Sequence, residues 1–159
     1  QEMTDRLKLM AGASWVRWSR FDQILVTGSQ GDTITQEIQN YSNAWAYSLG
    51  GEYQLNPQLA LRAGITLDFT PTSDERRSVR IPSDDRRIFS IGAGWSPTDD
   101  LTLDFAYSYL TERGTSVSQE RSDLLASEAT GGVPVGGASY SANYKNEAHG
   151  FGAQLTYRF

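Results

Sequence analysis

The chain has 159 residues and a net charge of −5, with 38% hydrophobic residues and no cysteine. This length is enough for one domain with an interior of its own. No uncharged apolar run approaches the roughly 18 residues that a membrane-spanning helix needs, so a helical membrane protein is excluded. The arginines form no basic stripe, which argues against a nucleic-acid partner. The absence of cysteine excludes disulfides, thiolate metal sites and a cysteine nucleophile.

The first two predicted strands cover about residues 6–26 and 33–55. Both show the period of two that is typical of a strand with unlike faces. In the first strand the apolar or small residues are Leu7, Leu9, Ala11, Ala13 and Trp15, and Val16 and Trp18 blur the pattern near its end. In the second strand one face has Trp45, Tyr47, Leu49, Gly51, Tyr53 and Leu55, and the other has Ala46, Ser48, Gly50, Glu52 and Gln54.

Four further strands are predicted at about residues 58–70, 86–95, 101–110 and 140–159. They repeat the alternation, with the apolar residues again at odd positions. The stretch FGAQLTYRF, residues 151–159, is the clearest case, since Phe151, Ala153, Leu155, Tyr157 and Phe159 alternate with small or polar residues.

Two environments produce such a pattern. The apolar face of a soluble antiparallel sheet meets a core, whereas that of an outer-membrane barrel meets lipid while the other face lines a wet lumen. The apolar stretches here run about 9–11 residues, which is the length that a tilted strand needs to cross a bilayer. Aromatic residues also gather at the strand ends, as expected for two girdles at the lipid headgroups. The predicted girdle residues are Trp15, Trp45, Tyr53, Trp95, Tyr107, Tyr109 and Tyr157.

The connections between the predicted strands alternate in length. Residues 56–58 (NPQ) and 96–100 (SPTDD) read as tight turns, whereas about 71–85 and 111–139 are long and polar. Short turns on one side and long loops on the other are the asymmetry of outer-membrane barrels. The sequence therefore predicts an all-β protein, an antiparallel transmembrane β-barrel.

Six strands are too few to close a barrel. An open sheet leaves unpaired peptide groups in hydrocarbon, each costing several kcal/mol, and about eight strands make the smallest barrel in use. The first ten residues, QEMTDRLKLM, also lack the order of a signal peptide. We therefore expect the chain to be mature or part of something longer, with residues 1–159 forming part of a wall that other strands complete.

Several stretches resemble the C-terminal region of the FadL-type long-chain fatty acid transporters of Gram-negative outer membranes. They are ASWVRWSRFDQILV, the strand beginning at Trp45, LRAGITLDFTP, RRSVRIPSDDRR and LTYRF. No single motif is diagnostic, but their order and spacing together are fairly specific, and the similarity covers nearly the whole chain.

The resemblance implies a fourteen-stranded barrel to which this chain supplies the last six strands. It implies passive uptake of hydrophobic compounds such as long-chain fatty acids or aromatic hydrocarbons across the outer membrane of a Gram-negative bacterium. The implied partners are the lipid bilayer with its lipopolysaccharide, the remaining N-terminal strands and plug, and the barrel-insertion machinery. That machinery would read Tyr157 and Phe159 as a C-terminal signal. The plug and the kinked strand of the family are absent here, and the last external loop is longer than usual.

The loop at 71–85 holds the candidate substrate-binding residues, Arg77 and Arg86. A guanidinium matches a carboxylate with two hydrogen bonds, so either residue is suited to bind a fatty acid headgroup. The alternative is that neighbouring carboxylates already neutralise these arginines in a solvated network. Those carboxylates are Asp74, Glu75, Asp84 and Asp85.

The polar residues expected to face the lumen are Glu52, Arg62, Asp68 and Asp104. They line a polar passage, or they pair across strands or with the plug. Several glycines stand at even positions between Gly50 and Gly152. We interpret them as small residues that make room in the lumen.

The sequence shows no catalytic constellation, and we expect no cofactor and no metal. The single histidine, His149, stands near the rim of the last predicted strand without a recognisable nucleophile. Two alternatives to transport stay open, a barrel enzyme such as a protease or lipid hydrolase and a structural or adhesive barrel. The enzyme alternative requires His149.

Overall fold

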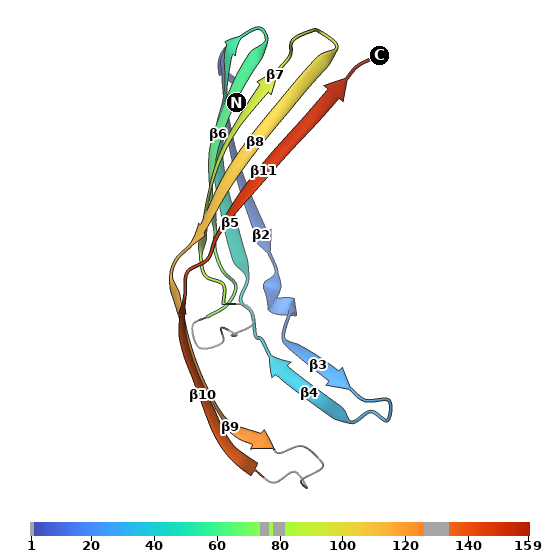
Figure 1. Ribbon diagram of the computed structural model, residues 1–159, viewed down its shortest axis with the longest axis vertical. Coiled ribbons are helices and arrows are strands. Elements are labelled where there is room, and N and C mark those ends of the chain that lie inside the picture. The colour runs from blue at the N-terminus through green and yellow to red at the C-terminus, as the bar shows by residue number, and fades with distance from the viewer. Residues whose placement is uncertain (1, 74–76, 78–81, 126–133) are drawn as a thin grey trace.

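The protein is built from β-strands, as its computed structural model shows for residues 2–73, 77, 82–125 and 134–159 (Figure 1). The strands are β1 (Glu2–Thr4), β2 (Leu7–Val16), β3 (Gln23–Thr27), β4 (Thr33–Ile38), β5 (Ala44–Asn56), β6 (Leu59–Asp68), β7 (Arg86–Trp95), β8 (Leu101–Glu112), β9 (Thr115–Leu125), β10 (Pro134–Tyr144) and β11 (Glu147–Tyr157). One turn of 3-10 helix, η1, covers Trp18–Arg20. Within these described residues, no helix has the length and apolar character to cross a membrane.

A single antiparallel sheet forms the main body of the molecule. Its strand order is β1-β2-β5-β6-β7-β8-β11, so each of the long strands lies beside its neighbours in the chain once the external hairpins are set aside. Figure 1 shows this sheet curving, with β8 and β11 in front and β2 behind. The remaining strands form two separate hairpins, β3–β4 and β9–β10, which extend from one end of the sheet.

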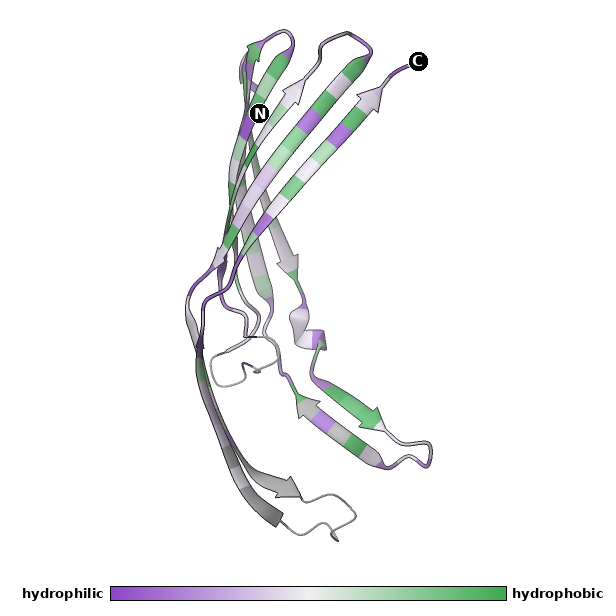
Figure 2. Cartoon of the chain, in the orientation of Figure 1, coloured by the Kyte–Doolittle hydropathy of each residue, from purple (hydrophilic) through white to green (hydrophobic). Residues whose placement is uncertain are grey.

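The register gives the sheet two unlike faces. Between the six long strands, odd residues pair with odd and even with even, apart from the Asn56–Leu59 pair at the first turn. Since directly paired residues point to the same side, the odd positions make one continuous face across all six strands. That face is apolar, and Figure 2 shows the alternation along β8 and β11.

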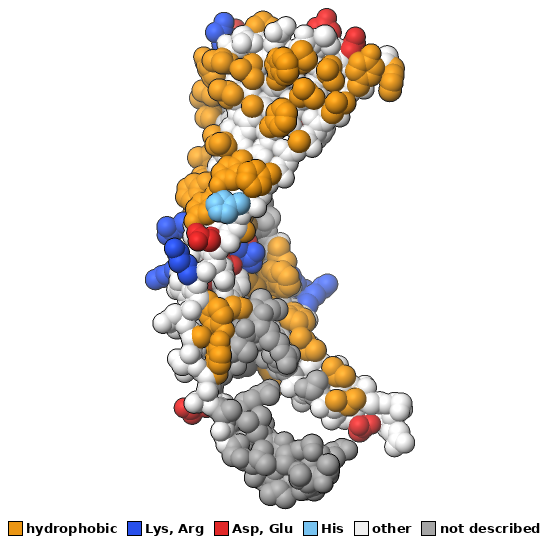
Figure 3. All heavy atoms as spheres, viewed as in Figure 1, with side chains coloured by type: hydrophobic (Ala, Val, Ile, Leu, Met, Phe, Trp, Pro, Cys, Tyr) orange, Lys and Arg blue, Asp and Glu red, His pale blue; other side chains and the backbone are white. Residues whose placement is uncertain are grey.

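The apolar face covers no core. Phe151 is 82% exposed and Ile91 is 62% exposed, and in the described part of the chain the only buried apolar side chains are Ala44, Ala60 and Val117. Hydrophobic side chains accordingly cover the visible face of the sheet in Figure 3. An exposed apolar surface of this extent needs a partner that is not water.

The two short connections lie at one end of the sheet. After β5, the Asn56 side-chain oxygen accepts the Gln58 amide at 2.9 Å, an Asx-type turn, and the Ser96 amide donates to the Gln58 carbonyl at 2.8 Å. The long connections, residues 17–43, 69–85 and 113–146, leave from the other end. This arrangement agrees with the predicted asymmetry of an outer-membrane barrel.

The structure divides three of the predicted strands. The stretch 6–26 breaks after Val16 into η1 and β3, and 33–55 breaks between β4 and β5, where Asn40 has a φ of 44°. The stretch 140–159 breaks between β10 and β11, and much of the predicted loop 111–139 consists of β9 and β10. Parts of the loops predicted at 71–85 and 111–139 lie outside the described residues.

Candidate functional site

The even face of the sheet carries an ion-paired triad that crosses four strands. Arg62 on β6 donates through Nε to Glu52 Oε2 on β5 at 2.6 Å and through an Nη atom to Asp104 Oδ1 on β8 at 2.6 Å. All three side chains are partly exposed on this face. Two carboxylates surround one guanidinium, so the triad carries a net negative charge.

Two glycines on β7 make the span from Arg62 to Asp104 possible. Gly92 pairs with Arg62, and Gly94 pairs with Asp104. A Cβ atom at Gly94 would lie 2.8 Å from Asp104 Oδ1 and 3.1 Å from the Arg62 guanidinium, and one at Gly92 would lie 3.0 Å from the Phe105 carbonyl oxygen. The intervening strand therefore has no side chain where the arginine crosses it.

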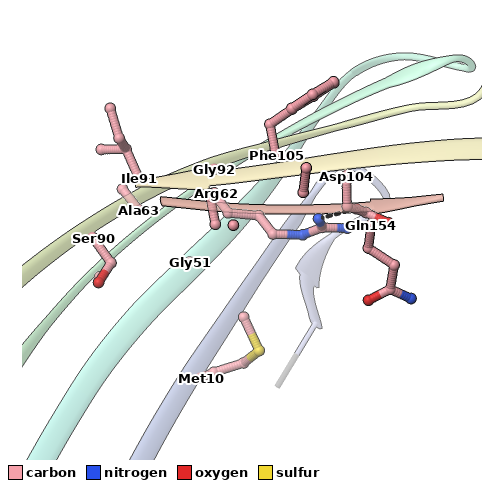
Figure 4. A pocket seen from close by; sticks show the side chains of 14 residues that line it. Met10, Gly51, Arg62, Ala63, Ser90, Ile91, Gly92, Asp104, Phe105 and Gln154 are labelled. Atoms are coloured by element: carbon pink, nitrogen blue, oxygen red, sulfur yellow. Dashed lines mark hydrogen bonds and ion pairs between the residues drawn. The ribbon is translucent and has the colours of Figure 1, made fainter. Parts of the chain in front are cut away.

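Beside the triad the even face has a hollow of about 650 Å³. Figure 4 shows Met10, Ser90 and Gln154 on this side, while Ile91 and Phe105 point to the opposite side of the sheet. The other lining residues are mostly small and include Gly64, Gly92, Ala106 and Gly152. The hollow thus combines small or apolar walls with a charged edge, a combination typical of sites for hydrophobic ligands.

A second polar network joins the external ends of the strands. The Glu112 carboxylate accepts a hydrogen bond from Asn146 Nδ2 at 2.6 Å and from Ser83 Oγ at 3.3 Å. Arg86 lies between two carboxylates, with Nε 3.5 Å from Glu112 Oε1 and 3.6 Å from Asp68 Oδ2. Asp85 Oδ1 accepts the Thr70 amide at 2.9 Å. This network ties the described end of the 69–85 connection to β6, β8 and β11.

The two predicted substrate-binding arginines have different surroundings. Arg77 is 3% exposed, donates from Nε to the Ser83 carbonyl at 2.8 Å and has an Nη atom 3.6 Å from Asp84 Oδ1. Arg86 is 37% exposed. Asp74 and Glu75, two of the predicted neutralising carboxylates, lie outside the described residues. Among the described residues, the carboxylate partners are the predicted Asp84 for Arg77, and Asp68 and Glu112 for Arg86.

The predicted lumen-facing residues share the even face and pair across strands. Glu52, Arg62 and Asp104 form the triad, and Asp68 pairs with Arg86. The sequence prediction misses Glu112 because the predicted strand stops at Leu110, and it misses Asn146 because no pattern distinguishes this residue within the predicted strand 140–159. The odd-even pattern offered a signal for Glu112, since it continues the even face two residues beyond Leu110.

The predicted girdle residues occupy both ends of the odd face. Trp15 pairs with Trp45 near the long connections, where Tyr109 also lies, whereas Tyr107 lies nearer the middle of the sheet, opposite Ile91. Tyr53, Trp95 and Tyr157 lie near the short turns. The rings of Tyr157 and Phe159 pack edge to face, with their centroids 5.4 Å apart. The role of Tyr157 and Phe159 as an insertion signal stays a prediction.

His149 lies on the odd face among aromatic side chains. Its Nδ1 is 2.8 Å from the Tyr107 hydroxyl, and its ring centroid is 5.1 Å from the ring centroid of Tyr109. No group of three or more metal-ligating side chains occurs in the part of the chain that the structure describes.

A single-layer antiparallel sheet with a continuous apolar face, a polar opposite face and unequal connections at its two ends defines the wall of a transmembrane β-barrel. The sequence comparisons identify its family. The profile of the family described as "Outer membrane protein transport protein (OMPP1/FadL/TodX)" matches residues 1–159. The chain belongs to this family of outer-membrane proteins, which confirms the resemblance inferred from its motifs.

Individual relatives agree with this assignment. The chain is 31% identical to "Outer membrane protein P1" of Haemophilus influenzae, with 99% of this chain and 33% of the relative covered. It is 28% identical to the "Long-chain fatty acid transport protein" of Escherichia coli K12, with 67% of this chain and 24% of the relative covered. The crystal structure of a Pseudomonas aeruginosa FadL homologue superposes with a TM-score of 0.80 at 30% identity, covering 98% of this chain and 33% of that one. The chain thus spans a third or less of the length of these relatives.

Proposed function

We propose that this chain forms part of the barrel wall of an outer-membrane protein for passive uptake of hydrophobic compounds, such as long-chain fatty acids or aromatic hydrocarbons. The observation that carries the proposal is the hollow of about 650 Å³ on the even face, lined mostly by small residues, in a chain of this family. A barrel that only anchors a surface structure has no need of such space on its inner face. The relative from Escherichia coli K12 named for long-chain fatty acid transport supports the same substrate class.

Within this function the even face lines the lumen, and the substrate passes it by diffusion with no covalent step and no cofactor. Arg86 is the better candidate of the two arginines for contact with a carboxylate headgroup. It lies at the external end of the even face, is partly exposed, and its Nε stands 3.5–3.6 Å from its two carboxylate partners, longer than the 2.6 Å contacts of Arg62. Arg77 is buried, so its role in this proposal is to order the loop.

The partners follow from residence in the outer membrane. They are the acyl chains and lipopolysaccharide around the barrel, the strands and plug that complete it, and the machinery that inserts it. The open edges of the sheet support the need for further strands, since among the described strands β11 pairs only with β8.

The test uses the complete product of the gene, expressed in the outer membrane of a strain that lacks its own long-chain fatty acid transporter. We expect initial uptake of labelled oleate, or of a labelled aromatic hydrocarbon, to rise above that of the empty strain. The matched variants are Ala106→Trp, which fills the hollow on the even face, and Ala93→Trp, which places the same ring on the odd face. Ala106→Trp should lower uptake several-fold, while Ala93→Trp should leave it unchanged.

Uptake equal to that of the empty strain for both compounds would contradict the proposal. So would equal uptake by the two tryptophan variants at matched amounts of folded barrel. His149→Ala tests the enzyme alternative, which requires this histidine. If the variant keeps its uptake and loses no hydrolytic activity, the enzyme alternative is excluded.

A further inference from the structure

Three cationic side chains lie at the end of the sheet from which the long connections leave. Arg87 is near the start of β7, Arg113 follows β8 and Lys145 precedes β11, and all three are exposed. Figure 3 shows Lys and Arg side chains gathered at the waist of the visible face, next to the band of hydrophobic side chains. We call Arg87, Arg113 and Lys145 the rim cations.

The register places Arg87 on the odd, lipid-facing side, and Arg113 and Lys145 stand at odd positions just beyond the β8–β11 ladder. Arg87 pairs with Thr111, and Thr111 pairs with Glu147. The ladders continue one step beyond, since the Arg113 amide donates to the Asp85 carbonyl at 3.0 Å and the Glu112 amide to the Asn146 carbonyl at 3.0 Å. Arg113 and Lys145 are therefore opposite each other, and strand spacing puts the three backbone positions about 5–12 Å apart.

The rim cations differ from the arginines of the even face and of the 69–85 connection. Arg62, Arg77 and Arg86 each lie within 4 Å of at least one carboxylate. Among the described residues, no carboxylate lies that close to Arg87, Arg113 or Lys145. Of the two acidic residues in the same rows, Asp85 accepts the Thr70 amide at 2.9 Å, and Glu147 accepts the Tyr109 hydroxyl at 2.7 Å while it attracts Lys145 from beyond ion-pair distance. The donor groups of the rim cations are thus available to an external anion.

Below the rim cations, the same face has an apolar groove of about 820 Å³. Its odd-face lining consists of Leu61, Ile91, Ala93, Phe105, Tyr107, Phe151 and Ala153. The alanines Ala93 and Ala153 leave space between the larger aromatic side chains, and this space forms the groove. Ile91 is four residues along β7 from Arg87, which corresponds to about 13 Å, so an acyl chain attached to a headgroup at the rim reaches the groove.

We propose that the rim cations and this groove form a binding site for one molecule of lipopolysaccharide, with the lipid A phosphates on the cations and an acyl chain in the groove. The long connections mark this end as external, so the patch lies at the depth of the outer-leaflet headgroups. Three clustered cations match a lipid with two phosphates better than one with a single phosphate. Tyr109 and His149 lie between the two parts, and Tyr107 lies at the upper edge of the groove, so that their polar tips are where headgroup sugars begin. The proposal rests on outer-membrane residence and not on transport.

The test titrates the purified, delipidated product of the complete gene with bis-phosphorylated lipid A in detergent micelles, followed by native mass spectrometry. The variant Arg87→Gln/Arg113→Gln/Lys145→Gln should bind lipid A about 100-fold more weakly, at about fivefold for each of the three cations lost. The control Arg6→Gln/Lys8→Gln/Arg158→Gln removes the same charges near the short turns and should bind as the unaltered protein does. Ala93→Trp fills the groove at unchanged charge and should also weaken binding, although oleate uptake stays unchanged.

Parallel titrations with phosphatidylglycerol and monophosphorylated lipid A identify the lipid. We expect both to bind the unaltered protein more weakly than bis-phosphorylated lipid A. Equal binding of lipid A by the rim-cation variant and the control variant would overturn the proposal, as would equal binding of phosphatidylglycerol and lipid A. Heat-modifiable mobility in gels shows that each variant is folded before its titration.

Discussion

At the scale of single residues, Arg62 joins strands that are not neighbours. Its guanidinium contacts Glu52 on the adjacent β5 and Asp104 on β8, one strand beyond the adjacent β7. Such a link restrains the curvature of three successive strand pairs. Because the side chains are partly exposed, solvent screens the pairs and their contribution to stability is modest.

Arg62→Gln should lower the free energy of unfolding by about 1 kcal/mol or less, because two carboxylates lose their shared cation. Adding Asp104→Asn should restore part of that loss, since a single carboxylate then remains. Urea unfolding of the complete barrel in lipid vesicles measures both variants. A double variant that is less stable than Arg62→Gln would contradict this account.

Gly92 and Gly152 test the need for close approach, because both pair with Ala106 from opposite sides. A Cβ atom at Gly92 would lie 3.0 Å from a backbone carbonyl oxygen, whereas one at Gly152 would lie 3.9 Å from the nearest atom, Ala106 Cβ. Gly92→Ala should therefore cost about 1–3 kcal/mol of unfolding free energy, and Gly152→Ala should be neutral or slightly stabilising. Equal unfolding midpoints in urea would show that β7 has room to move.

At the scale of elements, the period of two carried most of the sequence prediction. It placed the six long strands of the sheet because each has one apolar and one polar or small face, as in β8 with Leu103, Phe105 and Tyr107. It also puts the three charged residues of the triad on one face, which the register shows to be the even face. The contacts between strands could not be predicted in this way. The pattern within one strand does not show that the Arg62 side chain passes over β7 to Asp104, because that contact depends on the register between strands.

The period of two does not predict the two hairpins, β3–β4 and β9–β10. β9 has the sequence TSVSQERSDLL, which lacks an apolar face over most of its length, so it read as a loop. The predicted strands 6–26 and 33–55 include β3 and β4 because the isoleucines and valine of these segments suit a strand, although the intervening residues 39–43 (QNYSN) are polar. Both faces of β3 are exposed along its length, so no single solvent boundary imposes alternation on it.

The two faces of the sheet should respond differently to the same charge. Ile91→Arg places a guanidinium on the odd face near the middle of the membrane and should cost about 2–4 kcal/mol. Ala106→Arg places it on the even face one row away, where water solvates it, and should cost less than about 1 kcal/mol. Unfolding from vesicles measures the difference, and a reversed order would mean that the faces are assigned the wrong way round.

At the scale of the whole molecule, the sheet is an open wall with edges at β11 and at β1–β2. Hydrocarbon does not tolerate unpaired peptide groups, so further strands must meet both edges in the membrane. The relatives are about three times as long as this chain, which agrees with a wall that other strands complete. The total of fourteen strands stays a prediction from the resemblance to FadL-type transporters.

The unequal ends of this wall predict its orientation. An epitope tag in the β3–β4 turn, between Gly28 and Asp32, should be accessible to antibody on intact cells, because long connections face outward. The same tag in the short turn between Ser96 and Asp100 should be accessible only after the outer membrane is permeabilised. Labelling of the short-turn tag on intact cells would contradict the orientation.

The most direct test of the central claim is the solvent around each face of β8. The chain has no cysteine, so single cysteines can be placed at each position from Leu103 to Tyr109 and spin-labelled in the complete barrel in vesicles. We predict that labels at 103, 105, 107 and 109 collide with oxygen dissolved in lipid, and that those at 104, 106 and 108 collide with a water-soluble nickel chelate. Accessibility without this alternation, or with odd positions open to the nickel chelate, would contradict a wall with lipid on one side and water on the other.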